Sequence, residues 1–120
     1  MNRKTYIDIQ KEEYYKIVSI KCRYLSNESV SFNNFGLNHI LRKNDKDRTF
    51  QDQYRRFELM KFCKYILENI DVEVEYRVSQ NKSSTAYFWG ITGVVNRKKI
   101  KVVVRRINNG QLIFLSIMDQ

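Results

Sequence analysis

The spacing of apolar residues along the chain changes once, near residue 71. Before that point, apolar side chains recur every three or four positions, which is typical of one face of an α-helix. This repeat predicts a first helix over residues 10–25, a short helix over residues 35–43 and a long helix over residues 49–70. Beyond residue 71 the period falls to two, which is typical of β-strands with one buried face.

Four segments with this alternating pattern follow Asp71, and turn signals separate them. They cover residues 72–78, 85–95, 99–107 and 111–118. Short connections of this kind join antiparallel neighbours. We therefore predict an α+β fold, with N-terminal helices over about residues 8–70 packed on a four-stranded antiparallel meander sheet over about residues 71–119. The chain has no proline and no Gly/Ser-rich linker, so we expect one domain over residues 1–120.

The dipeptide Asn109-Gly110 predicts a tight hairpin between the last two strands. A two-residue type I′ turn needs positive φ at both central positions, which these residue types tolerate. The turn sets the register, so that one face of the strand pair is aliphatic and suits the core. On the opposite face, the predicted pairs are Arg105 with Phe114, Val103 with Ser116, and Lys101 with Met118.

A turn at Arg97-Lys98 extends this register to the preceding strand. It places Gly90 opposite Arg105, where the missing side chain would let a ligand approach the guanidinium. Phe88 and Phe114 offer rings nearby, and unpaired bases stack on such rings. This face of the sheet is therefore a candidate nucleic-acid surface, although a solvated face with no ligand has the same pattern.

Basic residues outnumber acidic residues along the chain. The 22 Lys and Arg against 13 Asp and Glu give a formal charge of +9, and aromatic residues make up 13% of the chain. A cationic excess together with many rings favours a polyanionic partner, with RNA or DNA ahead of an acidic membrane surface. Because 42% of the residues are hydrophobic, the chain can form a core, which excludes a disordered tail.

Several classes of site are missing from the sequence. The start, MNRKTYIDIQ, has no apolar stretch behind its basic residues, and no segment is apolar enough to span a membrane, so we expect a soluble, cytoplasmic protein. Cys22 and Cys63 lie far apart, which indicates neither a disulfide framework nor a zinc site. The four glycines match no phosphate-binding loop. We expect no cofactor and no metal, and the single histidine, His39, excludes mechanisms that need two.

One arginine falls on the apolar stripe of the long predicted helix. The stripe runs through Cys63 and Leu67, and extending it towards the N-terminus reaches Arg56. A buried guanidinium needs a partner, so Arg56 either pairs with Asp52, four residues earlier, or opens into a polar cavity at the end of the helix. The sequence leaves both interpretations open.

Four segments of the chain together resemble a known group of proteins: FNNFGLNHILRK, QYRRFELMKF, YFWGITG and KIKVVVRRINNGQLIFLSIM. They are similar to the phage-associated branches of the ribonuclease superfamily that contains barnase, EndoU, colicins and RelE-like toxins. The resemblance covers about residues 28–119. It implies N-terminal helices followed by a four-stranded antiparallel sheet, and an activity as a toxin that cuts RNA.

Sites in this superfamily combine a histidine at the end of the short helix, basic residues on helices or strands, and a polar residue on the last strand. The resemblance carries these roles to His39, to Arg55 or Arg56, to Arg105 and to Ser116. Several relatives use a second histidine or a glutamate and histidine pair, and this chain has one histidine alone. The candidates for the other proton-transfer group are Glu73, Glu75 and Tyr87.

Metal-independent RNA cleavage uses the 2′-hydroxyl as nucleophile, so an enzyme must move two protons and stabilise a dianionic phosphorane. His39 suits either proton transfer because the pKa of histidine lies near working pH. Arg105 and Arg56 suit the phosphorane, and Ser116 suits a hydrogen bond to a nonbridging oxygen. The residues expected to bind substrate are Arg42 and Lys43, on roughly the same helical face as His39, with Arg55, Lys101, Phe88 and Phe114.

The sequence therefore favours a small metal-independent endoribonuclease of the toxin type. Its partners would be RNA, as tRNA, mRNA or ribosome-bound mRNA, and an acidic antitoxin or immunity protein that covers the cationic site. The alternative is a non-catalytic RNA- or DNA-binding module that uses a basic, aromatic sheet face. A structural or protein-interaction domain with a basic face is the third class. No interaction with a membrane is expected.

Overall fold

The N-terminal half of the chain contains four α-helices with short strands between them. The computed structural model describes residues 1–120 and confirms the α+β class. The helices are α1 (Arg3–Ile17), α2 (Asn34–Leu41), α3 (Phe50–Leu59) and α4 (Cys63–Glu68), with 3-10 turns η1 (Arg23–Leu25) and η2 (Met60–Phe62). No helix is both long enough and apolar enough to cross a membrane.

The first helix begins and ends earlier than predicted. α1 ends at Ile17 because Val18 takes a positive φ of 63°, which breaks the helical path. Residues 19–22 form strand β1 (Ser19–Cys22), which pairs with β2 (Glu28–Ser31). Ile20 and Cys22 are buried at the spacing of two that a strand requires. The prediction of a helix over residues 18–25 is therefore wrong.

The long helix predicted over residues 49–70 is interrupted at η2. Thr49 caps α3, since its hydroxyl accepts a hydrogen bond from the backbone N–H of Asp52 at 3.2 Å. The turn at η2 separates α3 from α4, but the predicted apolar stripe remains buried on both sides of the turn. Cys63 is confirmed as a small core residue.

The main sheet has six strands, so the predicted four-stranded sheet is too small. Its order is β1–β2–β8–β7–β6–β5, where the later strands are β5 (Glu73–Gln80), β6 (Thr85–Val95), β7 (Lys98–Ile107) and β8 (Leu112–Asp119). β5 to β8 form the predicted antiparallel meander, and β2 adds the β1–β2 hairpin by pairing parallel to β8. A separate ribbon joins β3 (Arg42–Lys43) to β4 (Lys46–Asp47).

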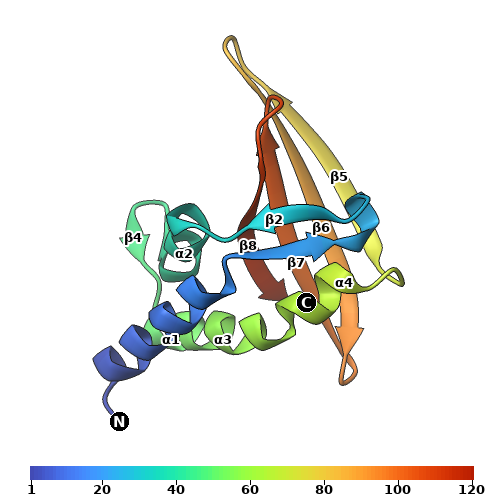
Figure 1. Cartoon of the computed structure of the whole chain (residues 1–120). Helices are drawn as coiled ribbons and strands as arrows, with labels where there is room; N and C mark the ends of the chain where they lie inside the picture. The colour runs from blue at the N-terminus through green and yellow to red at the C-terminus, as the bar shows by residue number, and fades with distance from the viewer.

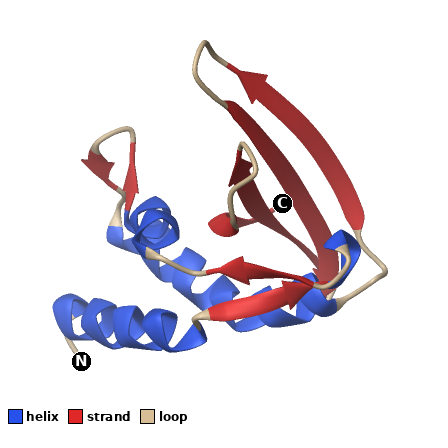
Figure 2. Cartoon of the chain, turned by 45° about the horizontal axis from the view of Figure 1, so that its top comes forward, coloured by secondary structure: helices blue, strands red, loops and turns tan.

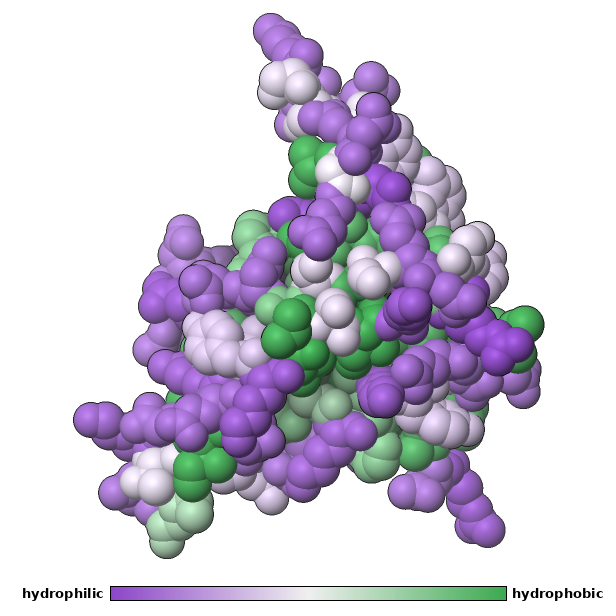
Figure 3. All heavy atoms as spheres, in the orientation of Figure 1, coloured by the Kyte–Doolittle hydropathy of each residue, from purple (hydrophilic) through white to green (hydrophobic).

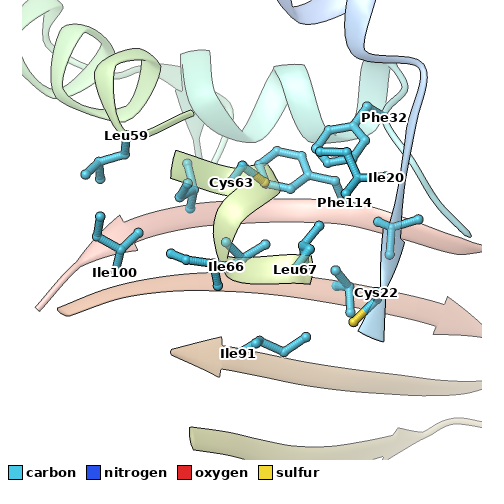
Figure 4. Close-up of a cluster of buried hydrophobic side chains, with 14 of the residues drawn as sticks. Ile20, Cys22, Phe32, Leu59, Cys63, Ile66, Leu67, Ile91, Ile100 and Phe114 are labelled. Carbon is cyan, nitrogen blue, oxygen red and sulfur yellow. The ribbon is translucent and has the colours of Figure 1, made fainter. Parts of the chain in front are cut away.

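The helices and the β1–β2 hairpin lie on one side of the long strands. Figures 1 and 2 show them grouped against the lower part of the sheet, with the β5–β6 hairpin projecting beyond them. Figure 4 shows the core between α4 and the sheet, where Ile66 and Leu67 lie above Ile91, with Ile100 to one side. In the view of Figure 3, polar residues cover the projecting hairpins and the outer sides of the helices. We call the side of the sheet away from this core the open face.

A β-bulge in β8 divides the register between the last two strands. The predicted pairs of Val103 with Ser116 and of Lys101 with Met118 are confirmed. Nearer the hairpin the observed pairs are Val104 with Phe114 and Arg105 with Ile113. Leu115 is the extra residue, and one extra residue moves the side chains before it to the opposite face. The loop spans residues 108–111 with positive φ at Asn108 and not at Gly110, so the predicted type I′ turn is wrong.

Phe114 lies in the core as a result of this bulge. Its side chain is fully buried and stacks on Phe32, with the ring centroids 4.9 Å apart. The prediction that Phe114 binds substrate on the open face is therefore wrong. Arg105 keeps its predicted face, because β7 itself carries no extra residue.

The turn between β6 and β7 lies one residue earlier than predicted. Asn96 and Arg97 form the two-residue loop with φ values of 51° and 67°. This turn sets Phe88, in place of Gly90, opposite Arg105. Because the register moves by two positions, Phe88 and Gly90 still lie on the open face, as predicted.

Candidate functional site

Helix α2 packs closely against β8, and this contact places the candidate histidine. A Cβ atom at Gly36 would lie 2.5 Å from the Phe114 ring and 2.6 Å from the Phe114 carbonyl oxygen, so only glycine permits the approach. The Tyr14 hydroxyl of α1 donates a hydrogen bond of 2.7 Å to the carbonyl of Asn33, the residue that caps α2. Both contacts fix α2 at the edge of β8, with His39 in its last turn.

Arg105 reaches this helix from the open face of β7. Its guanidinium carbon lies 4.0 Å from the ring centroid of Phe35, and that ring lies 5.3 Å from the imidazole of His39. The Nε of Arg105 is buried and has no hydrogen-bond partner. Burial lowers the pKa of Arg105, and no carboxylate acts on it. Arg105 is therefore held beside His39 as a cation that the protein does not neutralise.

A second arginine approaches His39 from the loop before α3. Arg48 donates from Nε to the carbonyl oxygen of His39 at 2.9 Å and from Nη1 to the carboxylate of Asp52 at 3.0 Å. Only 9% of the Arg48 side chain is exposed. Arg48 was not among the site residues predicted from the sequence. It lies in a run of alternating charges that is typical of a solvated loop.

Arg56 connects the helix to the last strand. Its Nε pairs with Asp52 at 3.2 Å, and its Nη1 donates to the Ser116 hydroxyl at 3.3 Å and to the Ile117 carbonyl at 2.8 Å. The pairing of Arg56 with Asp52 is therefore confirmed, and its Nη1 is held by β8. Its side chain is 12% exposed. Burial lowers the pKa of Arg56, and the neighbouring charge of Arg48 lowers it further.

The imidazole of His39 faces this group of arginines. Burial lowers its pKa, and the positive charges of Arg48, Arg105 and Arg56 lower it further, so His39 is neutral at pH 7. Neither ring nitrogen makes a hydrogen bond within the chain. A cavity of about 280 Å³ opens beside the ring. It is lined by Asn38, His39, Arg42, Asn44 and Asp45. We call His39, Arg48, Arg56, Arg105 and Ser116 the arginine–histidine cluster.

Asp52 is the carboxylate that balances part of this charge. It accepts hydrogen bonds from Arg48, Arg55 and Arg56. Burial by itself would raise its pKa, but the charges of Arg56 and Arg48 outweigh burial and hold the pKa below its usual range. One carboxylate thus serves three guanidinium groups, while Arg105 has none. The cluster keeps an excess of positive charge that suits an anion.

The predicted basic residues around His39 lie in other places than expected. Arg42 and Lys43 form β3 beyond the end of α2, so the prediction that they share a helical face with His39 is wrong. Arg42 pairs with Asp47 at 3.0 Å and lines the cavity beside the imidazole. Arg55 is half exposed and contacts Asp52 at 3.0 Å. Arg42 thus stays near His39 through the tight turn that follows the helix.

The remaining predicted binding residues lie further along the open face. Phe88 and Lys101 line a cavity of ≈ 330 Å³ together with Gly90 and Val103. Lys101 Nζ lies 3.4 Å from the carboxylate of Glu75, across Gly90. These residues form a surface next to Arg105 rather than part of the cluster.

The candidates for a second proton-transfer group do not join the cluster. Glu73 and Glu75 lie on β5, at the far edge of the sheet from α2. Tyr87 lies on the side of the sheet opposite Arg105, stacked beside Trp89. The aromatic residue that does lie in the site is Phe35, four residues before His39 on α2, and that spacing is the signal that could have identified it.

The cluster contains three guanidinium groups, one imidazole and one hydroxyl. No group of three or more His, Cys, Asp or Glu side chains is close enough together to hold a metal ion. No family model, curated protein or solved structure matches the chain. The chemistry that the cluster can perform is the binding of an oxyanion beside a neutral imidazole.

Proposed function

We propose that this protein is a metal-independent endoribonuclease of the toxin type, which binds an RNA phosphate at the arginine–histidine cluster. One observation carries the proposal: Arg105, which no carboxylate neutralises, packs on the ring of Phe35, and that ring also contacts the neutral imidazole of His39. An isolated buried cation is costly, so a site that keeps one is suited to an anion that arrives from outside. A phosphodiester has that charge and presents two oxygens to a guanidinium.

In this proposal His39 is the general base. Its neutral imidazole takes the proton from the 2′-hydroxyl, whose oxygen then attacks the adjacent phosphorus. Arg105 stabilises the negative charge that develops on the phosphorane oxygens, together with the free Nη2 of Arg56. The Ser116 hydroxyl accepts from Arg56 and donates to a nonbridging oxygen. Water protonates the leaving 5′-oxygen, and the products are a 2′,3′-cyclic phosphate and a 5′-hydroxyl.

The pH dependence follows from the environment of His39. A base works in its unprotonated form, and the fraction of neutral imidazole rises with pH. Burial and the three arginines place the pKa of His39 below 6.5. The rate of cleavage should therefore rise with pH, with a midpoint below 6.5, and level off before neutral pH. A rate that falls across this range would instead indicate that protonated His39 acts as the acid.

The second candidate is a binding module without catalysis, and a row of residues on the open face favours it. Arg77, Phe88 and Arg105 occupy neighbouring positions on β5, β6 and β7. The guanidinium of Arg77 lies 4.1 Å from the centroid of the Phe88 ring. Cations interleaved with a ring suit a single-stranded nucleic acid, whose phosphates and bases they would contact. This row binds RNA in both candidates, and only the role of His39 distinguishes them.

The experiment is cleavage of an end-labelled single-stranded RNA in EDTA. We expect the wild-type protein to produce fragments with 2′,3′-cyclic phosphate ends. His39→Asn should bind the same RNA with unchanged affinity and leave it intact, because the arginines remain. The matched control is Asn38→Ala, which changes a neighbour that lines the same cavity and should cleave normally. Binding by the wild-type protein without cleavage at any enzyme concentration would favour the non-catalytic candidate.

A further inference from the structure

The outer edge of β5 has no partner in the fold. β5 is the last strand of the sheet, and in Figures 1 and 2 nothing covers its outer side along most of its length. Two large apolar side chains of this edge strand are exposed, Tyr76 at 57% and Val78 at 47%. The strand contains no proline and no bulge, two of the features that commonly prevent pairing at an edge, and its central charges, Glu75 and Arg77, have opposite signs.

The sequence of β5 is complementary to itself. If two copies of the strand pair antiparallel with the two-fold axis at Tyr76, Glu75 of each copy lies opposite Arg77 of the other. Val74 lies opposite Val78 in the same register, and the two Tyr76 side chains meet. Cross-strand pairs of opposite charge and of β-branched residues stabilise antiparallel strands. All the central positions of the strand are thus matched.

The neighbouring registers lack this match. An axis at Glu75 sets two carboxylates against each other at the centre, although Glu73 then faces Arg77, and an axis at Arg77 sets two guanidinium groups against each other. Like charges directly opposite destabilise a strand pair. An axis between two residues would set side chains of opposite faces against each other, such as Glu75 and Tyr76, which the pleat of an antiparallel pair does not allow. The sequence therefore selects one register.

The surroundings of Tyr76 also favour the pairing. Its ring lies 5.4 Å from that of Trp89 on β6. Pairing at this axis would join the rings of the two copies into one aromatic row on the helix side of the sheet. β5 carries two carboxylates and one guanidinium, so the excess positive charge of the chain lies elsewhere. Charge repulsion therefore does not keep two copies apart at this edge.

We propose that a second copy of this chain pairs with β5 through this register, which forms a symmetric dimer with one continuous twelve-stranded sheet. A two-fold axis through an antiparallel strand pair is perpendicular to the sheet. The open faces of both copies therefore lie on the same side, and each brings its own arginine–histidine cluster. The proposal does not depend on what that cluster binds.

The test is the mass of the full chain in solution, measured by light scattering over a wide range of concentrations. The wild-type protein should approach twice the 14.5 kDa of one chain as its concentration rises. Glu75→Arg and Arg77→Glu should each remain at the mass of one chain, because each creates two like-charge pairs. Mixed in equal amounts, the two variants should form a heterodimer, since every Arg then faces a Glu.

The control is Glu73→Arg, a reversal of charge on the same face of the same strand. In the proposed register Glu73 lies opposite Ser79, so this variant should dimerise as the wild type does. Circular dichroism would show that each variant is folded. A wild-type protein that stays at 14.5 kDa overturns the proposal. So does a dimer that the single variants leave intact, or a mixture of the two variants that does not associate.

Discussion

Two neighbouring arginines on β7 lie in opposite environments. Arg106 points to the helix side of the sheet, where it pairs with Glu28 of β2 and lies 6.0 Å from the Trp89 ring. Arg105 points to the open face, where it stacks on Phe35 and meets no carboxylate. Each has a buried Nε without a hydrogen-bond partner.

Under the proposed function, the difference separates a structural cation, Arg106, from a functional one, Arg105. Burying a guanidinium costs free energy, and Arg106 recovers part of it from an ion pair within the fold. Arg105 has no such ion pair, and its neighbours Arg48 and Arg56 are cations as well, since all three lower the pKa of His39. A site that gathers positive charge without balancing it is arranged for a ligand rather than for stability.

The largest expected effect comes from removing each arginine in turn. Arg105→Gln should lower kcat/KM for RNA cleavage by about 100- to 1,000-fold, the usual cost of losing a group that stabilises a developing anion. Arg106→Gln should leave kcat/KM unchanged, because its side chain is on the other side of the sheet. The measurement is steady-state cleavage of the same single-stranded RNA by both variants.

The free energy of unfolding should respond in the opposite order, with a larger loss in Arg106→Gln than in Arg105→Gln. Arg106→Gln should lower the free energy of unfolding by about 1 kcal/mol, the value of a partly exposed ion pair. Arg105→Gln should leave it unchanged or raise it, since an unpaired cation is removed. Urea unfolding of the two variants measures this. Equal losses of activity and stability in both would show that the two arginines do not differ in role.

The carboxylate of Asp52 borders the cluster and balances part of its charge. Asp52→Asn removes the charge that balances Arg48, Arg55 and Arg56. We expect the free energy of unfolding to fall by about 3 kcal/mol, because the arginines stay buried without it. The control is Glu13→Gln, which breaks an exposed pair with Lys16 and should have little effect. An Asp52→Asn protein as stable as wild type would mean that solvent already screens the charges of these arginines.

The third prediction concerns the contact that places α2. Gly36→Ala adds a Cβ that would lie 2.5 Å from the Phe114 ring, so α2 must move away from β8. We expect a loss of about 1–3 kcal/mol in the free energy of unfolding and reduced cleavage, since His39 moves with the helix. Gly90→Ala is the control, because there the added atom meets only the flexible end of Lys101. Equal stability of the two variants would show that the close approach of α2 is not required.

Much of the candidate site was predictable because it depends on local patterns. The alternation along β7 is unbroken, so the sequence places Arg105 on the open face correctly. The helical stripe through Cys63 reaches Arg56, and the contact of Arg56 with Ser116 on β8 follows from its place on that stripe. His39 is the only histidine, so composition by itself identifies it.

The errors arise where a single residue changes the geometry. The bulge at Leu115 moves Phe114 into the core, and no local signal marks it. Val18 ends α1 through a positive φ that a β-branched residue rarely adopts, and the strand after it pairs with β2, which in turn pairs with the distant β8. Arg48 is buried by contacts with α2 and α3 that its charged neighbours in sequence do not indicate.

The central claim is that His39 and the arginines form one phosphate site, and NMR titration of the single histidine tests it most directly. In the free protein the midpoint should lie below 6.5, because burial and three cations disfavour the protonated ring. A 2′-deoxy dinucleotide, which cannot be cleaved, should raise the midpoint by placing a phosphate beside the ring. A midpoint at or above 6.5 that the dinucleotide does not move would contradict the account.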